Sequence, residues 1–497
     1  MANKVKRSVV IAGGGTAGWL TAFSLASRLG HLLDITLVES DAIGTVGVGE
    51  ATIPTMRTFH RLLGIDEREF MAATQATFKL GIQFENWGQQ NDSYIHSFGE
   101  IGQRSWMAEF HEFWLAARSQ GHGGSLDEYC LELLAARENK FCVSVDNQPV
   151  NYAFHLDATA YARYLRHKSE EAGVTRTEGK IDQVNLDPDN GHITSLTLAD
   201  KQQVCGDVFI DCSGFRALLI GQALGVGFDD WSHYLAADSA VAVQTELTGE
   251  PVPYTRAIAH NNGWQWQIPI QHRMGNGLVY SSRFLNDDQA SEQLMANLPG
   301  TPLTDPRTIK FKTGRRRQAW QKNCVAIGLS GGFLEPLEST SIHLITTSIL
   351  RLMKLFPFDD DMQAQALRFN TETATELETI RDFIILHYHA TARTDSDFWQ
   401  FYRRMEIPET LQHRIDIFCN NGYVWPDDVG LFRTDSWVQV MLGQGLMPRQ
   451  HHQAGHLLAP SQLKDQLSAL RQSIAGRLQR MPLHGDFLAQ YCPARKD

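Results

Sequence analysis

The chain has 497 residues, of which 43% are hydrophobic and 20% are charged, a balance typical of a globular protein with a large buried core. The formal net charge of -11 argues against nucleic acid or an anionic membrane surface as a partner. The seven cysteines form no C-x-x-C pair, which predicts a reduced, cytoplasmic protein without a structural zinc site.

The first predicted element is a buried strand at residues 8–12. Its apolar run gives way to glycines after five residues, which is too short for the apolar core of a signal peptide. Nowhere does the chain reach the roughly 18 uninterrupted apolar residues that a membrane-spanning helix requires. We therefore expect no membrane association.

A glycine-rich turn follows this strand. Residues 13–18 (GGGTAG) fit the pattern G-x-G-x-x-G, a helix is predicted over 20–29, and a second strand over 34–39 ends in an acid. Glycines let the backbone approach a pyrophosphate at the positive end of the helix, and the acid can accept hydrogen bonds from both ribose hydroxyls. The pattern predicts a Rossmann-type dinucleotide site that contains Gly13, Gly15, Thr16, Ala17, Gly18 and Glu39.

Two later strands indicate which dinucleotide binds. Residues 207–212 and 323–328 each form an apolar strand that leads into a glycine turn, an arrangement with which flavoproteins close the pocket around FAD. The second turn places Gly328, Phe333 and Leu334 near the cofactor. No second G-x-G-x-x-G is present for a nicotinamide cofactor, so we expect the flavin to arrive already reduced.

Residues 263–269 (GWQWQIP) contain two tryptophans one residue apart. In a strand, Trp264, Trp266 and Ile268 would share one face and the two glutamines the other, and Pro269 would end the strand. Taken alone, this pattern is typical of an ordinary core strand.

Two ionisable residues have unusual neighbours. Lys79 lies in the apolar run ATFKLG, and Glu338 lies in FLEPLEST just before a predicted helix start. The simplest interpretation of Lys79 is a lysine with a buried stem and its amine at the surface. The simplest interpretation of Glu338 is an acid that compensates a helix dipole. A catalytic interpretation needs support from other parts of the chain.

That support comes from a resemblance. Residues 13–18, residues 47–54 (GVGEATIP), Lys79, the W-x-W-x-I-P run and residues 333–340 together resemble the flavin-dependent halogenases of the tryptophan-halogenase type. The resemblance implies an α/β (α+β) flavoprotein monooxygenase-like fold with mixed sheets. It implies an FAD-binding and halogenation core over 1–350, with a substrate-side insertion at about 90–150, and a mostly helical substrate cap over 351–497.

The resemblance also implies a reaction. Reduced FAD and oxygen give a flavin hydroperoxide, a halide (chloride or bromide) attacks it, and the hypohalous acid passes through an internal tunnel to an aromatic substrate. The barrier between the two sites would contain Trp264, Trp266, Ile268 and Pro269. Lys79 would donate a hydrogen bond to hypohalous acid or form a haloamine, and both options stay open. Glu338 would stabilise the arenium cation or accept its proton, whereas Glu335 is interpreted as structural.

Further site residues follow from the same resemblance. The loop at 47–54 is interpreted as a strap beside the flavin, the alternative being a simple connection, with contacts from Val48, Gly49, Glu50 and Ala51. Halide would bind the backbone N–H groups of Thr340 and Ser341, and the tryptophan-specific enzymes usually have glycine at the second position. The substrate would contact His96, Phe98 and Ser339, although a surface histidine is nearly as good an interpretation of His96.

The substrate and partners are predicted only as classes. The stretches at 432–437 and 444–448 lack the tyrosine pair of tryptophan-specific enzymes, which favours indole or another small aromatic compound over free tryptophan. The aromatic segment 105–142 fits core packing or, alternatively, the lining of a cavity. We expect a separate flavin reductase as a partner and no metal, the histidines at 451, 452 and 456 being solvated, and a homodimer is compatible with the sequence.

Two competing functions are weighed against the halogenase. A flavin-dependent aromatic hydroxylase would share the fold but would lack the tryptophan wall and would oxidise a nicotinamide cofactor itself. A flavin-binding protein without catalysis gives no reason for both Lys79 and Glu338.

Overall fold

The computed structural model describes residues 6–43, 49–105, 107–425 and 430–493. Val48, predicted to contact FAD, and Trp106, in the predicted aromatic segment, lie outside the described residues.

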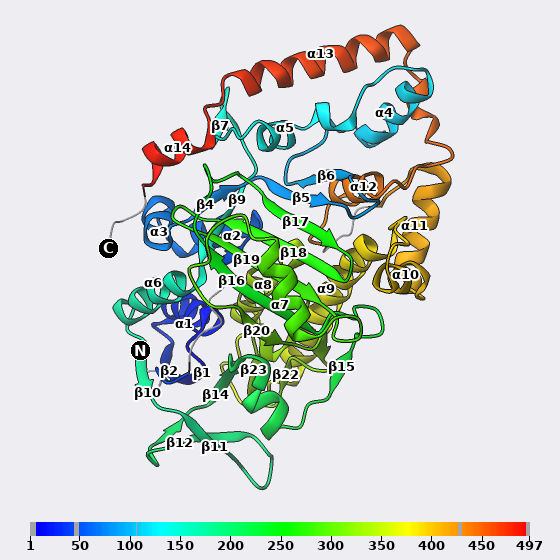
Figure 1. Ribbon diagram of the computed structural model, residues 1–497. Coiled ribbons are helices and arrows are strands. Elements are labelled where there is room, and N and C mark those ends of the chain that lie inside the picture. Colours follow the sequence, from blue (N-terminus) through cyan, green and yellow to red (C-terminus); the bar gives the residue numbers. More distant parts are fainter. Residues whose placement is uncertain (1–5, 44–48, 106, 426–429, 494–497) are drawn as a thin grey trace.

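The amino-terminal sheet carries the predicted dinucleotide unit (Figure 1). In the described residues it has the strand order β10-β2-β1-β14-β23-β22 and is parallel except for the β22–β23 pair. Its strands are β1 Arg7–Ala12, β2 Leu33–Glu39, β10 Thr175–Glu178, β14 Val208–Asp211, β22 Trp320–Gln321 and β23 Cys324–Ala326. The central strand β1 is buried over its last four residues, as the apolar run at 8–12 predicts. Helix α1 (Thr16–Leu29) begins within the glycine motif at residues 13–18, four residues earlier than predicted, and packs beside α6 (Ala158–Glu171).

A second, larger sheet carries the tryptophan strand. Its order in the described residues is β20-β16-β19-β18-β17-β5-β6, antiparallel except where β17 meets β5. Its strands are β5 Gly81–Glu85, β6 Ser93–Ser97, β16 Ser239–Thr245, β17 Thr255–His260, β18 Gly263–Pro269, β19 Met274–Tyr280 and β20 Arg307–Lys310. Trp266 is paired across the ladder with Gly277, where an added Cβ would lie 2.0 Å from the indole ring. The glycine therefore leaves the space that this indole occupies.

The described residues also contain four small sheets. They are formed by β3 Gly49–Ala51, β4 Thr77–Lys79 and β9 Ala153–Asp157; by β11 Ile181–Leu186, β12 Ile193–Leu198 and β13 Gln203–Cys205; by β15 Phe228–Asp230, β21 Gly314–Arg316 and β24 Gly332–Phe333; and by β7 Ser144–Val145 and β8 Gln148–Pro149. Of these, the β3–β9–β4 and β15–β21–β24 sheets join distant parts of the chain. In the first of them, β9 pairs with both β3 and β4. This pairing brings the predicted strap and Lys79 to neighbouring strands.

The remaining elements are helices. They are α2 Thr55–Leu63, α3 Glu67–Thr74, α4 Phe110–Ser119, α5 Leu131–Arg137, α7 Asp287–Ala296, α8 Ser341–Lys354, α9 Gln363–His389, α10 Asp397–Arg404, α11 Glu409–Asn421, α12 Thr434–Gly443, α13 Pro460–Gln479 and α14 His484–Tyr491. The named elements after α8 are helical, as predicted for the cap, but residue 350 falls inside α8 and α9 packs on both α8 and β22. The division at residue 350 stays a prediction.

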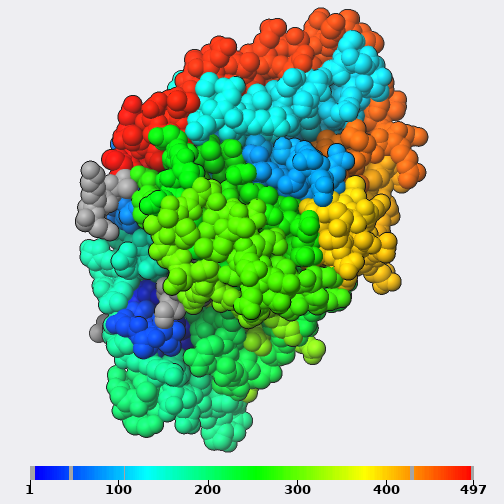
Figure 2. All heavy atoms as spheres, viewed as in Figure 1, coloured from blue at the N-terminus to red at the C-terminus, as the bar shows by residue number. Residues whose placement is uncertain are grey.

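The two ends of the molecule differ in composition. Helix α13, the last but one in the chain, lies against α4 and α5 at one end, and Figure 2 shows these segments side by side there, while the β11–β12 hairpin lies at the other end. The predicted α/β fold with mixed sheets is confirmed. No helix in the described part of the chain combines the length and the apolar character needed to cross a bilayer.

Candidate active site

A cavity of about 520 Å³ extends from the glycine turn to the tryptophan strand. Most of the residues predicted to contact FAD line it: Gly13, Gly15, Thr16, Ala17, Glu39, Gly49, Glu50, Ala51 and Phe333. Three others, Gly18, Gly328 and Leu334, are not among the lining residues. A Cβ at Gly328 would lie 2.9 Å from that of Ala17, and Leu334 is buried, so these residues shape the cavity without facing it.

The glycines of the turn have different roles. Gly13 has a φ of 116°, and an added Cβ would lie 2.3 Å from the carbonyl oxygen of Cys212. At Gly18 an added Cβ would lie 1.8 Å from the carbonyl oxygen of Gly13, whereas at Gly15 it would meet nothing within 4 Å. Gly13 and Gly18 thus permit the tight turn, and Gly15 leaves backbone open to the cavity.

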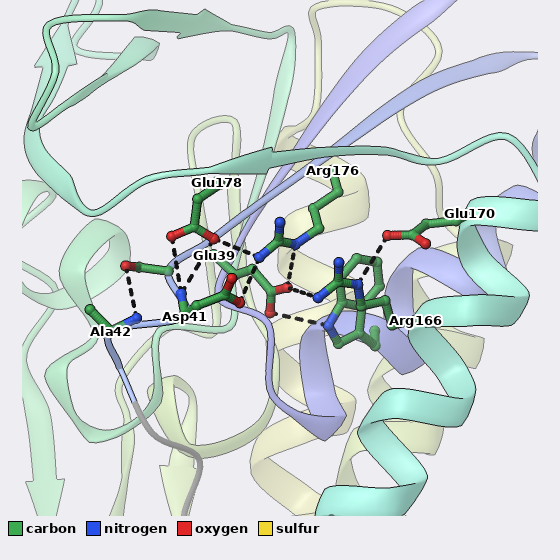
Figure 3. Close-up of polar contacts among 9 residues, drawn as sticks. Glu39, Asp41, Ala42, Arg166, Glu170, Arg176 and Glu178 are labelled. Carbon is green, nitrogen blue, oxygen red and sulfur yellow. Dashed lines mark hydrogen bonds and ion pairs between the residues drawn. The ribbon is translucent and has the colours of Figure 1, made fainter.

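Glu39 reaches the cavity with its charge already compensated (Figure 3). Its Oε1 lies 2.6 Å from Arg176 Nε and 3.4 Å from Arg166, and its Oε2 accepts a hydrogen bond from Trp19 Nε1. Arg176 also contacts Asp41 and is largely buried. The side chain therefore keeps a fixed position at the end of β2, where the sequence predicts contact with a ribose.

The opposite end of the cavity is closed by β18. Trp264, Trp266 and Ile268 share one face and line the cavity, as their alternation predicts. Pro269 ends the strand, as predicted, but it is not among the lining residues, since alternation along the strand separates it from the face of Ile268. Its carbonyl accepts a hydrogen bond from Thr77 on β4. The wall therefore consists of two indoles and an isoleucine.

A buried carboxyl group supports this wall from behind. Glu335 is fully buried, and its Oε1 accepts hydrogen bonds from Trp264 Nε1 at 3.3 Å and from the Tyr388 hydroxyl at 2.5 Å. Its Oε2 has no partner among the described residues. Burial raises the pKa of Glu335 to about 7, against the opposing effect of these two donors. This position agrees with the structural role predicted for it.

Lys79 lies directly behind the cavity. Ser339 lines the cavity, and its Oγ accepts a hydrogen bond of 2.7 Å from Lys79 Nζ. The carbonyl of Thr52 accepts a second one at 3.2 Å, and the ammonium lies 5.3 Å from the centre of the Phe98 ring. Lys79 is fully buried, which lowers its pKa to about 7 although the negative charge of Glu338 opposes this. The interpretation of Lys79 as a lysine with a surface amine is therefore wrong.

Glu338 is held between two histidines. His96 Nδ1 lies 2.9 and 3.1 Å from its two oxygens, and His387 Nε2 lies 2.7 Å from Oε1. The second contact is short but strongly bent, so we describe it as electrostatic. Burial alone would raise the pKa of Glu338, but the charge of His96 and the contacts with His387 and His96 outweigh it and lower the pKa to about 2. Glu338 is an ionised carboxylate.

Lys79 and Glu338 are neighbours but not an ion pair. Both are described, and no oxygen of Glu338 lies within 4.0 Å of Lys79 Nζ. Ser339 connects them, because it follows Glu338 in the chain and accepts the lysine hydrogen bond. The position of His96 is equally informative: it is buried beside Glu338, so it is not a surface histidine.

The residues predicted to bind halide lie at the start of α8. Ser341 lines the cavity, and Thr340 is the buried N-cap, whose hydroxyl has no partner among the described residues. The first N–H groups of a helix have no partners within the helix and attract anions. The strap residue Glu50 is half-buried and lines the same cavity, and burial raises its pKa to about 7.

Aromatic rings surround the Glu338 side of the cluster. Phe383 stacks on Phe432 with centroids 3.7 Å apart, and Trp437 meets Phe383 edge-on at 4.7 Å. The stretch at 432–437, which lacks the tyrosine pair, thus contributes two rings here. In the segment 105–142, Trp114 is buried and donates to a carbonyl of its own segment, which fits core packing.

Sequence reasoning missed three residues of this cluster: His387 on α9, Tyr94 on β6 and Gln444 after α12. His387 is fully buried, and its Nδ1 lies 2.9 Å from the Tyr94 hydroxyl, which also accepts from Gln444. The run HYH at 387–389 after four apolar residues is a weak signal of a buried histidine, but nothing in it indicates Glu338 as the partner. His451 and His456 contact each other at the surface, and the described residues contain no cluster of three potential metal ligands.

Comparison with known proteins gives consistent matches over nearly the whole chain. Residues 8–460 match the family model described as tryptophan halogenase. The tryptophan 6-halogenase SttH of Streptomyces toxytricini is 34% identical over 97% of this chain and 97% of its own length, and the tryptophan 7-halogenase RebH of Lentzea aerocolonigenes is 37% identical over 84% and 82%. A solved flavin-dependent halogenase from Xanthomonas campestris has a TM-score of 0.97 and 53% identity, with 99% of both chains covered. BrvH, a flavin-dependent halogenase from Brevundimonas sp. BAL3, has a TM-score of 0.93 and 47% identity over 98% and 99%.

Proposed function

The chain belongs to the tryptophan halogenase family, and from this premise we propose that it uses FADH2 to chlorinate or brominate an indole-like or other aromatic substrate, with Lys79 and Glu338 as its catalytic residues. It is an enzyme of the flavin-dependent halogenase class, whose members use FADH2 and a halide as co-substrate. The observation that carries the proposal is the position of Ser339. This residue lines the large cavity on one side and hydrogen-bonds Lys79 on the other.

The residues of the cavity fit a flavin dinucleotide. Gly15 offers open backbone next to the N-terminus of α1, where a pyrophosphate would bind, and Glu39 is held in place to meet a ribose. The indole wall at the other end would face the flavin ring. When bound, reduced FAD supplies, with oxygen, the oxidising equivalents that convert halide to hypohalous acid.

The tryptophan wall and Lys79 would have separate roles. Trp264 and Trp266 would keep the aromatic substrate away from the flavin, while hypohalous acid passes near Ser339 to Lys79. A buried amine whose pKa is near 7 exists partly as the free base at neutral pH. Lys79 can therefore donate a hydrogen bond to hypohalous acid or, as the free amine, form a haloamine.

Glu338 would act on the substrate. Electrophilic attack on an aromatic ring gives a cation that must lose a proton, and an ionised carboxylate nearby stabilises the cation and accepts the proton. The aromatic rings of Phe98, Phe432 and Trp437 provide flat surfaces beside it. We place the substrate on this side, where the stretch at 432–437 supports indole or another aromatic compound without the amino acid group.

Halide and partner complete the proposal. The N–H groups at the start of α8, at Thr340 and Ser341, would bind chloride or bromide beside the cavity. A separate flavin reductase would supply FADH2. This requirement distinguishes the proposal from an aromatic hydroxylase, which would oxidise its own nicotinamide cofactor.

The decisive experiment supplies the purified protein with FADH2, oxygen, bromide and indole and analyses the products by mass spectrometry. A product with the isotope doublet of bromine supports the proposal. A gain of one oxygen atom would indicate a hydroxylase instead, and unchanged indole together with unchanged larger arenes would indicate a flavin-binding protein. Parallel reactions with free tryptophan test the substrate class.

A further inference from the structure

The amide of Gln444 fixes the hydrogen-bond directions around Glu338. Gln444 Nε2 lies 3.0 Å from the backbone carbonyl of His387 and 3.1 Å from the hydroxyl of Tyr94. A backbone carbonyl can only accept, so the nitrogen end of the amide must face it. The second N–H of the same nitrogen then points to the Tyr94 oxygen.

The hydroxyl of Tyr94 in turn determines which ring nitrogen of His387 carries the proton. Because the Tyr94 oxygen accepts from Gln444, its own proton is free for His387 Nδ1 at 2.9 Å. His387 is fully buried, and burial lowers its pKa although the contact with Glu338 opposes this, so the ring is neutral. A neutral ring that accepts at Nδ1 carries its proton at Nε2, the nitrogen that lies 2.7 Å from Glu338.

The carboxylate of Glu338 is therefore contacted by an imidazole from each of two elements, through a hydrogen bond to His96 and a close electrostatic contact with the Nε2–H of His387. His387 contacts Oε1 from α9, and His96 Nδ1 contacts both oxygens from β6. Phe84 stacks on His387 at 4.4 Å and fixes the plane of its ring. The acceptor positions of Glu338 are turned toward the histidines, which leaves Lys79 outside ion-pair distance.

Among the described residues, Lys79 consequently has only neutral partners at hydrogen-bonding distance, Thr52 and Ser339. The two ionisable groups that act on it electrostatically are Glu338 and His155, which is on β9. His155 is neutral, because burial and the nearby lysine lower its pKa well below the usual range. Burial has the largest effect on the pKa of Lys79, and the distance to Glu338 sets how strongly the carboxylate opposes that effect.

We propose that His387, oriented by Tyr94 and Gln444, is a positioning residue that keeps the Glu338 carboxylate from forming an ion pair with Lys79. An ammonium in an ion pair holds its proton, whereas an unpaired buried amine releases it more readily. The chain Gln444–Tyr94–His387 thereby keeps Lys79 available to hypohalous acid. This inference rests on the proposed function and deepens it by assigning residues that set the state of the catalytic lysine.

The test measures Lys79 directly. Cyanic acid adds to a neutral amine to give a urea, and it is small enough to reach a group that hypohalous acid must reach. We would treat the full-length protein with cyanate across a pH series and quantify the carbamylation of Lys79 by peptide mass spectrometry. Lys201, whose side chain is 75% exposed, serves as the internal reference.

The variants are His387→Leu, which removes the donor, His387→Gln, which keeps an N–H group near the same position, and Tyr94→Phe, which removes the hydroxyl that orients the ring. We expect the pH midpoint of Lys79 carbamylation to rise by about one unit or more in His387→Leu, the scale on which an approaching opposite charge shifts a pKa. The shift should be smaller in Tyr94→Phe and smallest in His387→Gln. Lys201 should react alike in all four proteins.

Two results would overturn the inference. One is an unchanged Lys79 midpoint in both His387→Leu and Tyr94→Phe, and the other is a shift in His387→Gln as large as in His387→Leu. If His387→Leu does not fold, Tyr94→Phe and His387→Gln decide the question. Wild-type halogenation is assayed separately: absence of product would defeat the proposed function, whereas product formation with an unmoved midpoint would defeat this inference alone.

Discussion

The cavity and the buried polar cluster behind it are built on opposite principles. The cavity is lined by glycine backbone, apolar side chains and few charges, and its shape depends on what is missing, as at Gly15. The cluster around Glu338 consists of buried polar side chains, in which Glu338 lies between two histidines and Lys79 contacts the neutral Thr52 and Ser339. A pocket for a large cofactor thus needs small residues that leave space, whereas a site for a reactive electrophile needs polar side chains that are held in fixed positions.

The contact between the two regions is narrow. Ser339 belongs to both, and Trp264 lines the cavity while it donates to Glu335 behind the wall. If the oxidant forms in the cavity and reacts in the cluster, substitutions in the cluster should leave FADH2 oxidation in the cavity unchanged. Substitutions in the wall between them should affect the reactions in both regions.

Lys79→Ala should have the largest effect. We expect halogenated product to fall by at least about 100-fold, the usual scale for loss of a group that transfers a proton or an electrophile, while FADH2 oxidation continues. Product is measured by mass spectrometry and flavin oxidation by absorbance. Lys201→Ala, at an exposed side chain, is the control. If oxidation stops in Lys79→Ala as well, the two regions are not separate.

Glu335→Gln tests the role of the carboxyl group behind the wall, and the quantity measured is the thermal stability of the protein. The pKa of Glu335 in the folded protein, about 7, lies above the ordinary value of 4.5, so the wild type loses stability as the pH rises through this interval. The shift corresponds to about 3 kcal/mol. The variant lacks this loss, and its melting temperature relative to wild type should be higher at about pH 8 than at about pH 5. If the difference in melting temperature between variant and wild type is the same at both pH values, ionisation of Glu335 does not destabilise the folded protein. Glu50 has its pKa raised in the same interval, but it is present in both proteins.

Trp266→Ala should open a connection between the cavity and the substrate side of the cluster. Removing this indole opens the cavity toward the substrate side, so we expect roughly tenfold less halogenated product per FADH2 oxidised, equivalent to about 1.4 kcal/mol. The ratio of product to hydrogen peroxide released measures this coupling. Gln265→Ala, on the opposite face of β18, should leave the ratio near that of wild type. Unchanged coupling in Trp266→Ala would contradict the role of the wall.

Ser341→Gly should have the smallest effect. The backbone N–H at the start of α8 remains, but the side chain that lines the cavity is lost, and the larger space should favour bromide. We expect the ratio of brominated to chlorinated product in mixed halide to change by about two- to fivefold, below 1 kcal/mol. A ratio identical to wild type would place the halide elsewhere.

The same contrast explains what the sequence could predict. The cofactor site depends on local patterns: the strand, glycine turn and helix at 8–29 are contiguous, and the alternation at 263–269 alone determines which side chains face the cavity. The cluster depends on contacts between residues 79, 96, 338 and 387, which lie on four elements far apart in the chain.

Resemblance supplied three of these residues, and the fourth had no pattern to reveal it. His387 follows an apolar run that would occur in any buried helix, and its partner Glu338 is 49 positions away. For Gly18, Gly328 and Leu334, which are not among the lining residues of the cavity, the contact with FAD stays a prediction. A motif shows that a residue is needed near the cofactor, but only packing shows whether it lines the cavity or supports the wall.

Cys212 sits where the first glycine turn meets β14, and it lines the cavity. Burial, together with the charge of Asp211, raises the pKa of this thiol far above its usual range. Thiols are attacked by hypohalous acid mainly as thiolates, so a thiol kept protonated survives longer beside a source of that oxidant. We therefore expect the working lifetime of each enzyme molecule, counted in turnovers before self-inactivation, to depend on the proton that this sulfur retains.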